Sequence, residues 1–82
     1  MKPAVTLYTK TGCKLCQDTY NDLQALAAEF DLTIDTVDIT SSPELLRRYQ
    51  HEIPVLKIAQ GPTLSGTITR EAILEGLAER KL

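Results

Sequence analysis

The pattern of apolar residues in the first thirty positions leaves few folds open to this chain. Residues 4–8, Ala-Val-Thr-Leu-Tyr, are nearly continuously apolar, which is typical of a central strand covered on both faces. Thr11-Gly12 breaks this strand, and helical spacing then predicts a helix from about Lys14 to Phe30. Its buried stripe is expected to consist of Cys16, Tyr20, Leu23, Ala27 and Phe30. A strand that leads directly into a long amphipathic helix predicts an α/β fold.

The middle of the chain repeats the alternation of strand and helix. Residues 32–39 read as a second strand, although its apolar alternation changes phase between Ile34 and Val37, through either a bulge or burial on two sides. Ser41 and Glu44 have the spacing of a capping box, and Pro43 suits the first helical position. We expect a short helix that ends near Tyr49.

The last third predicts a hairpin and a final helix. Residues 54–59 form a third strand that begins with Pro54, and Gln60-Gly61-Pro62 turns the chain into a short edge strand at 63–65. Gly66 ends that strand. Thr69 is expected to cap a last helix whose inward positions are Ile73, Leu74 and Leu77.

These elements combine into one domain over residues 1–82. The first strand, helix and second strand should form a parallel, right-handed unit, while the third and fourth strands form an antiparallel hairpin. The sequence therefore predicts an α/β fold of order βαβαββα, with a four-stranded mixed sheet and helices on both faces.

Charge and cysteine content narrow the classes of function. A net charge of −2 gives no basic surface for nucleic acid or for an anionic membrane. The apolar run near the N-terminus is too short and too polar for a secretory signal or a membrane span, so a cytoplasmic location is expected. In a reducing compartment, a cysteine pair is more often catalytic, redox-sensing or metal-binding than structural.

The segment from Lys10 to Cys16 carries the candidate chemistry. The turn places Cys13 at the start of the long helix, where free backbone N–H groups and the helix dipole favour an anion. The thiolate is the reactive form of cysteine, and Lys10 and Lys14 add positive charge nearby. Cys16 lies one turn deeper, on the apolar stripe. We expect Cys13 to be the nucleophile and Cys16 the resolving thiol.

The other interpretations of the cysteine pair are a structural zinc site and two inert core cysteines. A structural zinc site usually has four protein ligands, whereas this chain has two cysteines and one histidine. Inert core cysteines fit poorly with a position directly after Gly12 in an exposed turn. No metal ligand is therefore assigned. A Cys-x-x-Cys at the junction of a strand and a helix is the pattern of thiol–disulfide exchange.

Residues 7–16 resemble the first strand and active-site turn of the glutaredoxin-like branch of the thioredoxin superfamily. Residues 36–39 resemble the end of its second strand, and residues 53–56 resemble the segment that bears its cis-proline. The resemblance, which covers nearly the whole chain, implies a thioredoxin-like fold. It also implies a cis Ile53–Pro54 bond beside Cys13 and pairing of the Ile53 backbone with an incoming thiol substrate. The candidate substrate contacts are Lys10, Lys14, Leu15, Ile53, Pro54 and Gly66.

The sequence also departs from its better-known relatives. Lys14-Leu15 stands where classical glutaredoxins carry Pro-Tyr, and Leu7 stands where thioredoxins carry a buried acid. Residues 65–69, Ser-Gly-Thr-Ile-Thr, replace the Gly-Gly pair and the Asp that grip glutathione. We therefore expect no tightly bound cofactor and consider glutathione only as a co-substrate.

The expected function is reduction of protein disulfides or glutathione mixed disulfides by a monomer, without nucleic-acid or membrane partners. The alternatives are a carrier of metal or of an iron–sulfur cluster, and a redox-sensing binding module without turnover. Arg47 and Arg48 are expected on a solvated helix face, with contact to a substrate carboxylate as the alternative. Asp35 and Asp38 receive no catalytic role.

Overall fold

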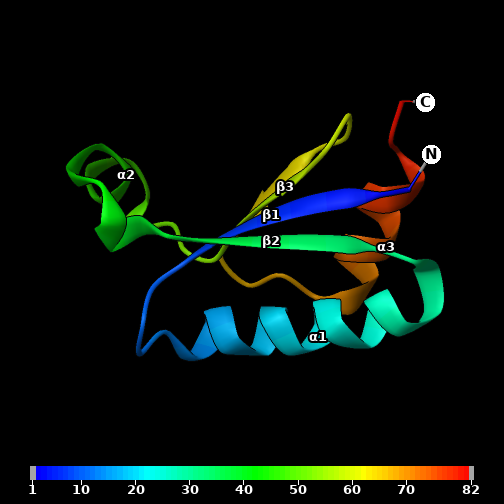
Figure 1. Ribbon diagram of the computed structural model, residues 1–82, viewed down its shortest axis with the longest axis horizontal. Helices are drawn as coiled ribbons and strands as arrows, with labels where there is room; N and C mark the ends of the chain where they lie inside the picture. Colours follow the sequence, from blue (N-terminus) through cyan, green and yellow to red (C-terminus); the bar gives the residue numbers. More distant parts are fainter. Residues whose placement is uncertain (1, 82) are drawn as a thin grey trace.

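The computed structural model describes residues 2–81, and its centre is a four-stranded sheet of order β2-β1-β3-β4 (Figure 1). The elements follow the predicted order: β1 (Ala4–Thr9), α1 (Lys14–Phe30), β2 (Thr33–Asp38), the 3-10 turn η1 (Ile39–Ser41), α2 (Pro43–Tyr49), β3 (Val55–Ile58), β4 (Thr63–Ser65) and α3 (Arg70–Ala78). The α/β class and the mixed sheet are thus confirmed.

Strand pairing explains the change of phase in the second strand. β1 runs parallel to β2 in an unbroken register from Ala4↔Thr33 to Thr9↔Asp38, and antiparallel to β3, which forms the hairpin with β4. Since directly paired residues share a face, Ile34 lies on the face of Val5 and Val37 on the face of Tyr8. The strand therefore has no bulge, and its apolar residues serve two faces.

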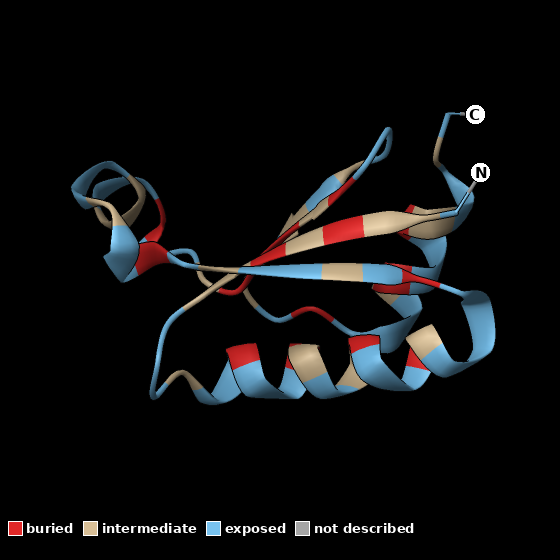
Figure 2. Ribbon diagram, viewed as in Figure 1, coloured by how far each residue is buried: buried red, intermediate tan, exposed pale blue. Residues whose placement is uncertain are grey.

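The main core lies between one face of the sheet and helices α1 and α3. Figure 2 shows the buried residues of α1 on the side that is turned toward the sheet. The cluster consists of Val5, Leu7, Leu23, Leu26, Leu32, Leu56, Ile58, Ile68 and Ile73. Each fully buried side chain of this kind contributes about 1.5–3 kcal/mol. This core fixes the start of α1, and with it the cysteine turn, against the end of β1.

The opposite face of the sheet is covered at one end only. Helix α2 lies beyond the carboxyl ends of β1 and β2 (Figure 1), where Tyr49, Ile39 and Val55 form a second, smaller cluster. The rings of Tyr8 and Tyr49 lie 4.8 Å apart. Helices contact both faces, as predicted, but unequally. The expectation that β1 is covered on both faces along its length is wrong, because Thr6 is only half-buried.

Two helix positions predicted to face inward are exposed. Phe30 has 48% of its surface exposed and Leu74 has 38%. Phe30 lies at the same angle around α1 as the buried residues, but it is the last residue of the helix and is exposed there. Leu74 follows the buried Ile73 and is turned about 100° from it. The buried stripe of α1 is instead Cys16, Thr19, Leu23 and Leu26, with Tyr20 and Ala27 half-buried.

Small differences remain at the element ends. Ser42, not Ser41, caps α2: its hydroxyl accepts a hydrogen bond from the Leu45 N–H at 3.5 Å. Ser41 instead ends the 3-10 turn, and Pro43 holds the first helical position as predicted. Thr69 caps α3, accepting from the Ala72 N–H at 3.1 Å.

Candidate active site

A tight turn delivers Cys13 to the start of α1. Gly12 has φ of 85°, a conformation that glycine adopts without steric cost. The Cys13 N–H donates to the Lys10 carbonyl at 3.2 Å, and the Cys13 carbonyl accepts from the Gln17 N–H at 3.1 Å. Cys13 is therefore the N-cap residue, half outside the helix. Its sulfur accepts a hydrogen bond from the Cys16 N–H at 3.2 Å, which is the interaction that stabilises a thiolate.

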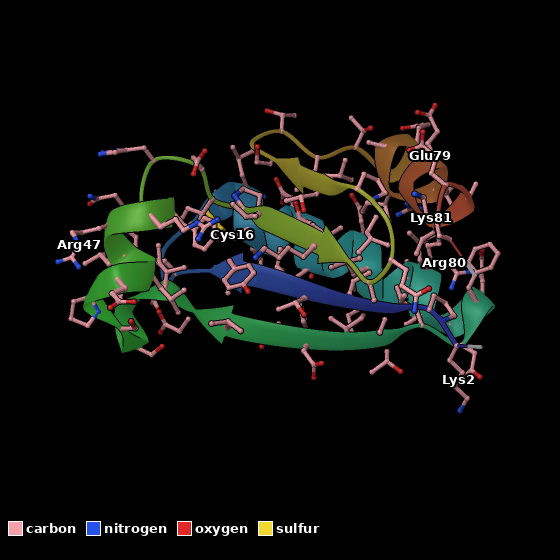
Figure 3. All side chains as sticks on the ribbon, turned by 90° about the horizontal axis from the view of Figure 1, so that it is seen from above. Lys2, Cys16, Arg47, Glu79, Arg80 and Lys81 are labelled. Carbon is pink, nitrogen blue, oxygen red and sulfur yellow. A yellow bond between two sulfur atoms is a disulfide. The ribbon has the colours of Figure 1, made fainter. Side chains whose placement is uncertain are left out.

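Cys13 and Cys16 are joined by a disulfide, with their Cα atoms 5.2 Å apart. The two residues differ in exposure, because Cys16 has only 2% of its surface exposed whereas Cys13 is half-buried. Figure 3 shows the sulfurs at the start of α1, on the side of the molecule where α2 lies. An incoming group therefore meets Cys13 first, and Cys16 stays behind it.

The two lysines of the motif lie in different surroundings. Lys14 forms an exposed ion pair with Asp18, one helical turn on, at 2.6 Å. Lys10 is exposed and lies between the end of β1 and the Thr11-Gly12 turn. A hollow beside the cysteines is lined by Lys10 but not by Lys14. Of the two lysines, Lys10 is therefore better placed to attract an anion at this hollow. Leu15 exposes 45% of its surface between the cysteines and offers an apolar contact there.

A hollow of about 400 Å³ opens on the β2 side of the cysteines, between the ends of β1 and β2 and the first turns of α1. It brings together Cys13, Cys16 and Lys10 from the predicted set. The remaining lining residues are Leu7, Thr9, Thr11, Gly12, Gln17, Tyr20, Thr36 and Asp38. Leu7, at the position of the buried acid of thioredoxins, gives this hollow an apolar floor. This hollow is not lined by the other predicted substrate contacts, which are Lys14, Leu15, Ile53, Pro54 and Gly66.

Asp38 brings a negative charge to this hollow, which the sequence analysis did not anticipate. The side-chain hydroxyl of Thr40 donates to Asp38 Oδ1 at 2.7 Å, and the Thr40 backbone N–H donates at 2.9 Å. These bonds, the hydroxyl first, lower the pKa of Asp38 below the ordinary 3.8. Its carboxylate is therefore ionised at neutral pH. The spacing Asp-x-Thr at a strand end is the local signal for this cap.

The segment before β3 has the conformation that the resemblance implies. The Ile53–Pro54 peptide bond is cis, and Pro54 is buried. The Gly66 N–H donates to the Pro54 carbonyl at 3.0 Å and to the Glu52 carbonyl at 3.3 Å, which ties the loop before α3 to this segment. The Ile53 N–H donates to the Tyr49 carbonyl at 3.1 Å. Pairing of Ile53 with an incoming chain would therefore use its carbonyl.

Among residues 2–81, no group of three or more His, Cys, Asp or Glu side chains is placed to hold a metal ion. In the same part of the chain, no helix has the length and apolar character needed to cross a bilayer.

The sheet order, the three helices and the cysteine turn define a protein of the thioredoxin fold. Three solved structures share it. The first, described as a malarial protein, aligns with a TM-score of 0.77 at 10% identity over 100% of both chains. Mitochondrial thioredoxin 3 from Saccharomyces cerevisiae, in its oxidized form, aligns with a TM-score of 0.73 at 17% identity, over 94% of this chain and 77% of its own.

The third structure, an N21Q mutant thioredoxin from Halobacterium salinarum NRC-1, aligns with a TM-score of 0.75 at 17% identity over 99% of this chain and 77% of its own. Identities this low show the fold alone. No curated protein sequence matches significantly. The family described as Glutaredoxin-like domain (DUF836) matches residues 4–78. The chain belongs to this glutaredoxin-like family.

Proposed function

We propose that the protein is a dithiol–disulfide oxidoreductase that reduces disulfides in proteins or mixed disulfides with glutathione. The observation that supports this most directly is the asymmetric pair at the start of α1. Cys13 is half-buried and accepts the Cys16 N–H, whereas Cys16 is buried and bonded to it. Exchange reactions need such an outer thiolate and an inner thiol within reach.

In the proposed cycle, the thiolate of reduced Cys13 attacks one sulfur of the target disulfide. The second target sulfur leaves as a thiolate and takes a proton from water, while Cys13 forms a mixed disulfide with the target. Cys16 then gives its proton to water, and its thiolate attacks the Cys13 sulfur, which releases the target's first sulfur as a thiolate that takes up a proton. The target gains two electrons, and the protein gains the Cys13–Cys16 disulfide. Two electrons from a small thiol or a reductase restore the dithiol.

Lys10 attracts the negative charge of the attacking or leaving thiolate, and Leu15 offers apolar contact to the target. We also assign Lys14, Ile53, Pro54 and Gly66 to the substrate surface. The proposed protein holds no tightly bound cofactor, uses glutathione at most as a co-substrate, and acts as a monomer in the cytoplasm on disulfide-containing proteins.

The decisive experiment compares the wild type with Cys13→Ser and Cys16→Ser. Reduction of a protein disulfide and of a glutathione mixed disulfide is measured, with circular dichroism to verify folding. Cys13→Ser should lose both activities, and Cys16→Ser should accumulate a mixed disulfide with a protein target. A fully active Cys13→Ser protein would refute the proposal. A brown, dimeric protein that contains iron would favour the cluster carrier, and a disulfide that cellular thiols cannot reduce would favour the binding module.

A further inference from the structure

A second hollow, of about 510 Å³, lies on the sheet face opposite α1, between α2 and the edge strand β4. We call it the Arg48–Lys57 hollow. Its lining residues are Arg48, Tyr49, Glu52, Val55, Lys57, Thr63 and Ser65. None of these lines the hollow beside the cysteines. This hollow is the part of the sheet face that α2 leaves open.

Two cations converge on the aromatic wall of this hollow. The Arg48 guanidinium carbon lies 5.4 Å from the centroid of the Tyr49 ring. The Lys57 ammonium lies 5.9 Å from the same centroid and 5.3 Å from that of Tyr8. Cation–π contacts at such distances orient the charged groups. Arg48 and Lys57 therefore both lie beside the Tyr49 ring, which lines the hollow with them.

Among the residues that the structure describes, neither Arg48 nor Lys57 forms an ion pair with an acidic side chain. The ion pairs found within residues 2–81 join Lys2 to Asp31, Lys14 to Asp18 and Arg70 to Asp22. Glu52 lines the hollow but makes no ion pair with Arg48 or Lys57. Lys57 is half-buried, so part of its hydration is already lost. An incoming anion would gain more from the half-buried Lys57 than from a fully exposed lysine, and the exposed Arg48 provides a second cation beside the same Tyr49 ring.

The hollow adjoins the segment proposed to contact the substrate. Glu52 and Val55, which line it, directly flank Ile53–Pro54 in the chain. Ser65 precedes Gly66, whose N–H bonds to the carbonyls of Glu52 and Pro54. A polypeptide bound along Ile53–Pro54 would therefore lie next to residues that line the hollow. The occupant that fits this placement is a neighbouring part of the disulfide-bearing chain.

We infer that the Arg48–Lys57 hollow binds Asp or Glu side chains that flank the target disulfide, and so selects acidic protein substrates. A carboxylate matches the planar fork of arginine and the point charge of lysine. The hydroxyl groups of Thr63 and Ser65 provide further donors at the β4 edge. This inference rests on the proposed function, because it names the class of protein on which the dithiol acts.

The test separates binding from turnover. Two peptides are made with serine in place of the target cysteines, one flanked on both sides by glutamate and the other by glutamine. Binding to the wild type is followed by NMR chemical shifts. Because the charge pairs would be partly exposed, we expect the glutamate peptide to bind about 3- to 10-fold more tightly than the glutamine peptide. Its binding should change the chemical shifts of Lys57 and Tyr49. The preference should weaken as salt is raised.

The variants Arg48→Gln and Lys57→Gln should each remove most of this preference, and Arg48→Lys should restore part of it. Arg47→Gln is the matched control, because Arg47 is an adjacent exposed cation outside the hollow. Equal binding of the two peptides by the wild type overturns the inference. A loss of preference in Arg47→Gln as large as in Arg48→Gln overturns it too, since the effect would then be general charge.

Turnover is then measured with the corresponding disulfide peptides. The wild type should show a kcat/KM ratio between the acidic and the neutral peptide that matches the binding ratio, and Arg48→Gln should bring that ratio close to one. If the wild type reduces neither peptide, the proposed function fails while the binding result still decides the site. If both peptides are reduced at equal kcat/KM, the selection of acidic substrates is refuted although the oxidoreductase remains.

Discussion

The sulfur of Cys13 accepts a hydrogen bond from the backbone N–H of Cys16 at 3.2 Å. Cys16 thus contacts Cys13 in two ways: its side chain forms the disulfide, and its backbone N–H donates to the sulfur of the proposed nucleophile. Because the N–H belongs to the first turn of α1, its direction is set by the helix and not by a mobile side chain. The main core holds that helix against the sheet, so packing far from the sulfurs fixes their geometry.

The reduced protein should be alkylated first at Cys13. Cys16 exposes only 2% of its surface, and Cys13 has the N–H partner that favours the thiolate. We expect iodoacetamide to modify Cys13 at least about tenfold faster, since thiolate character and access both govern the rate. Mass spectrometry of peptides at successive times measures both rates. Equal rates at the two residues would contradict the assigned roles.

Thr40 should control the charge of Asp38 beside the cysteines. The Thr40 hydroxyl bond is the first cause of the lowered pKa of Asp38, so Thr40→Val should raise that pKa toward 3.8. Because the folded value is the lower one, this interaction stabilises the fold fully above the ordinary value and is lost as the pH falls through the folded value. NMR titration of the carboxyl carbon measures the change. The control is Thr36→Val, because the hydrogen bonds to Asp38 come from Thr40 and not from Thr36. This variant should leave the titration of Asp38 unchanged.

The same substitution at two leucines should separate core from surface. Leu23 has 0% of its surface exposed, whereas Leu74 has 38% exposed. Leu23→Ala should lower the free energy of unfolding by about 2–5 kcal/mol, through lost burial and the cavity that remains. Leu74→Ala should cost much less. Urea denaturation of both variants measures the difference, and similar losses would mean that the inward face of one helix is assigned wrongly.

Gly76 lets α3 approach the sheet closely. A Cβ at this position would lie 2.5 Å from Cδ1 of Ile58 and 3.3 Å from Pro62. Gly76→Ala should therefore destabilise the protein by about 1–3 kcal/mol through overpacking, since Ile58 is itself buried. Ile58→Val removes the obstructing methyl group. In that background, Gly76→Ala should cost little, and a double-mutant cycle by urea denaturation should give a favourable coupling. Additive effects would contradict the contact.

Local patterns were sufficient for the order of elements. The switch from apolar run to helical stripe at Thr11-Gly12 and the hairpin signal at Gln60-Gly61-Pro62 both depend on neighbouring residues, and both were confirmed. The inward faces were harder to predict. Phe30 satisfies helical spacing but is the last residue of α1, and spacing does not show where the sheet stops covering a helix. Leu74 directly follows the buried Ile73, so it lies at the margin of the inward face of α3.

The chemistry of the cysteine turn could be predicted because it depends on residues that are neighbours in the sequence. The two hollows could not be predicted, because their lining residues come from separate helices and strands. Asp38 lines the same hollow as the cysteines because it pairs with Thr9 across β1 and β2. Arg48 from α2 and Lys57 from β3 both lie beside the Tyr49 ring. Neither arrangement leaves a periodic or motif signal in the chain.

The strand order also bears on how the protein behaves when it is crowded. Both outer strands, β2 and β4, present one row of unpaired backbone groups, a template on which another molecule can add a strand. β4 has only three residues, so it offers a poor template, but β2 has six. Asp35 and Asp38 place two exposed negative charges along the longer edge strand, β2. If the β2 edges of two molecules approached each other, these charges would repel one another, which protects this small protein against aggregation through β2.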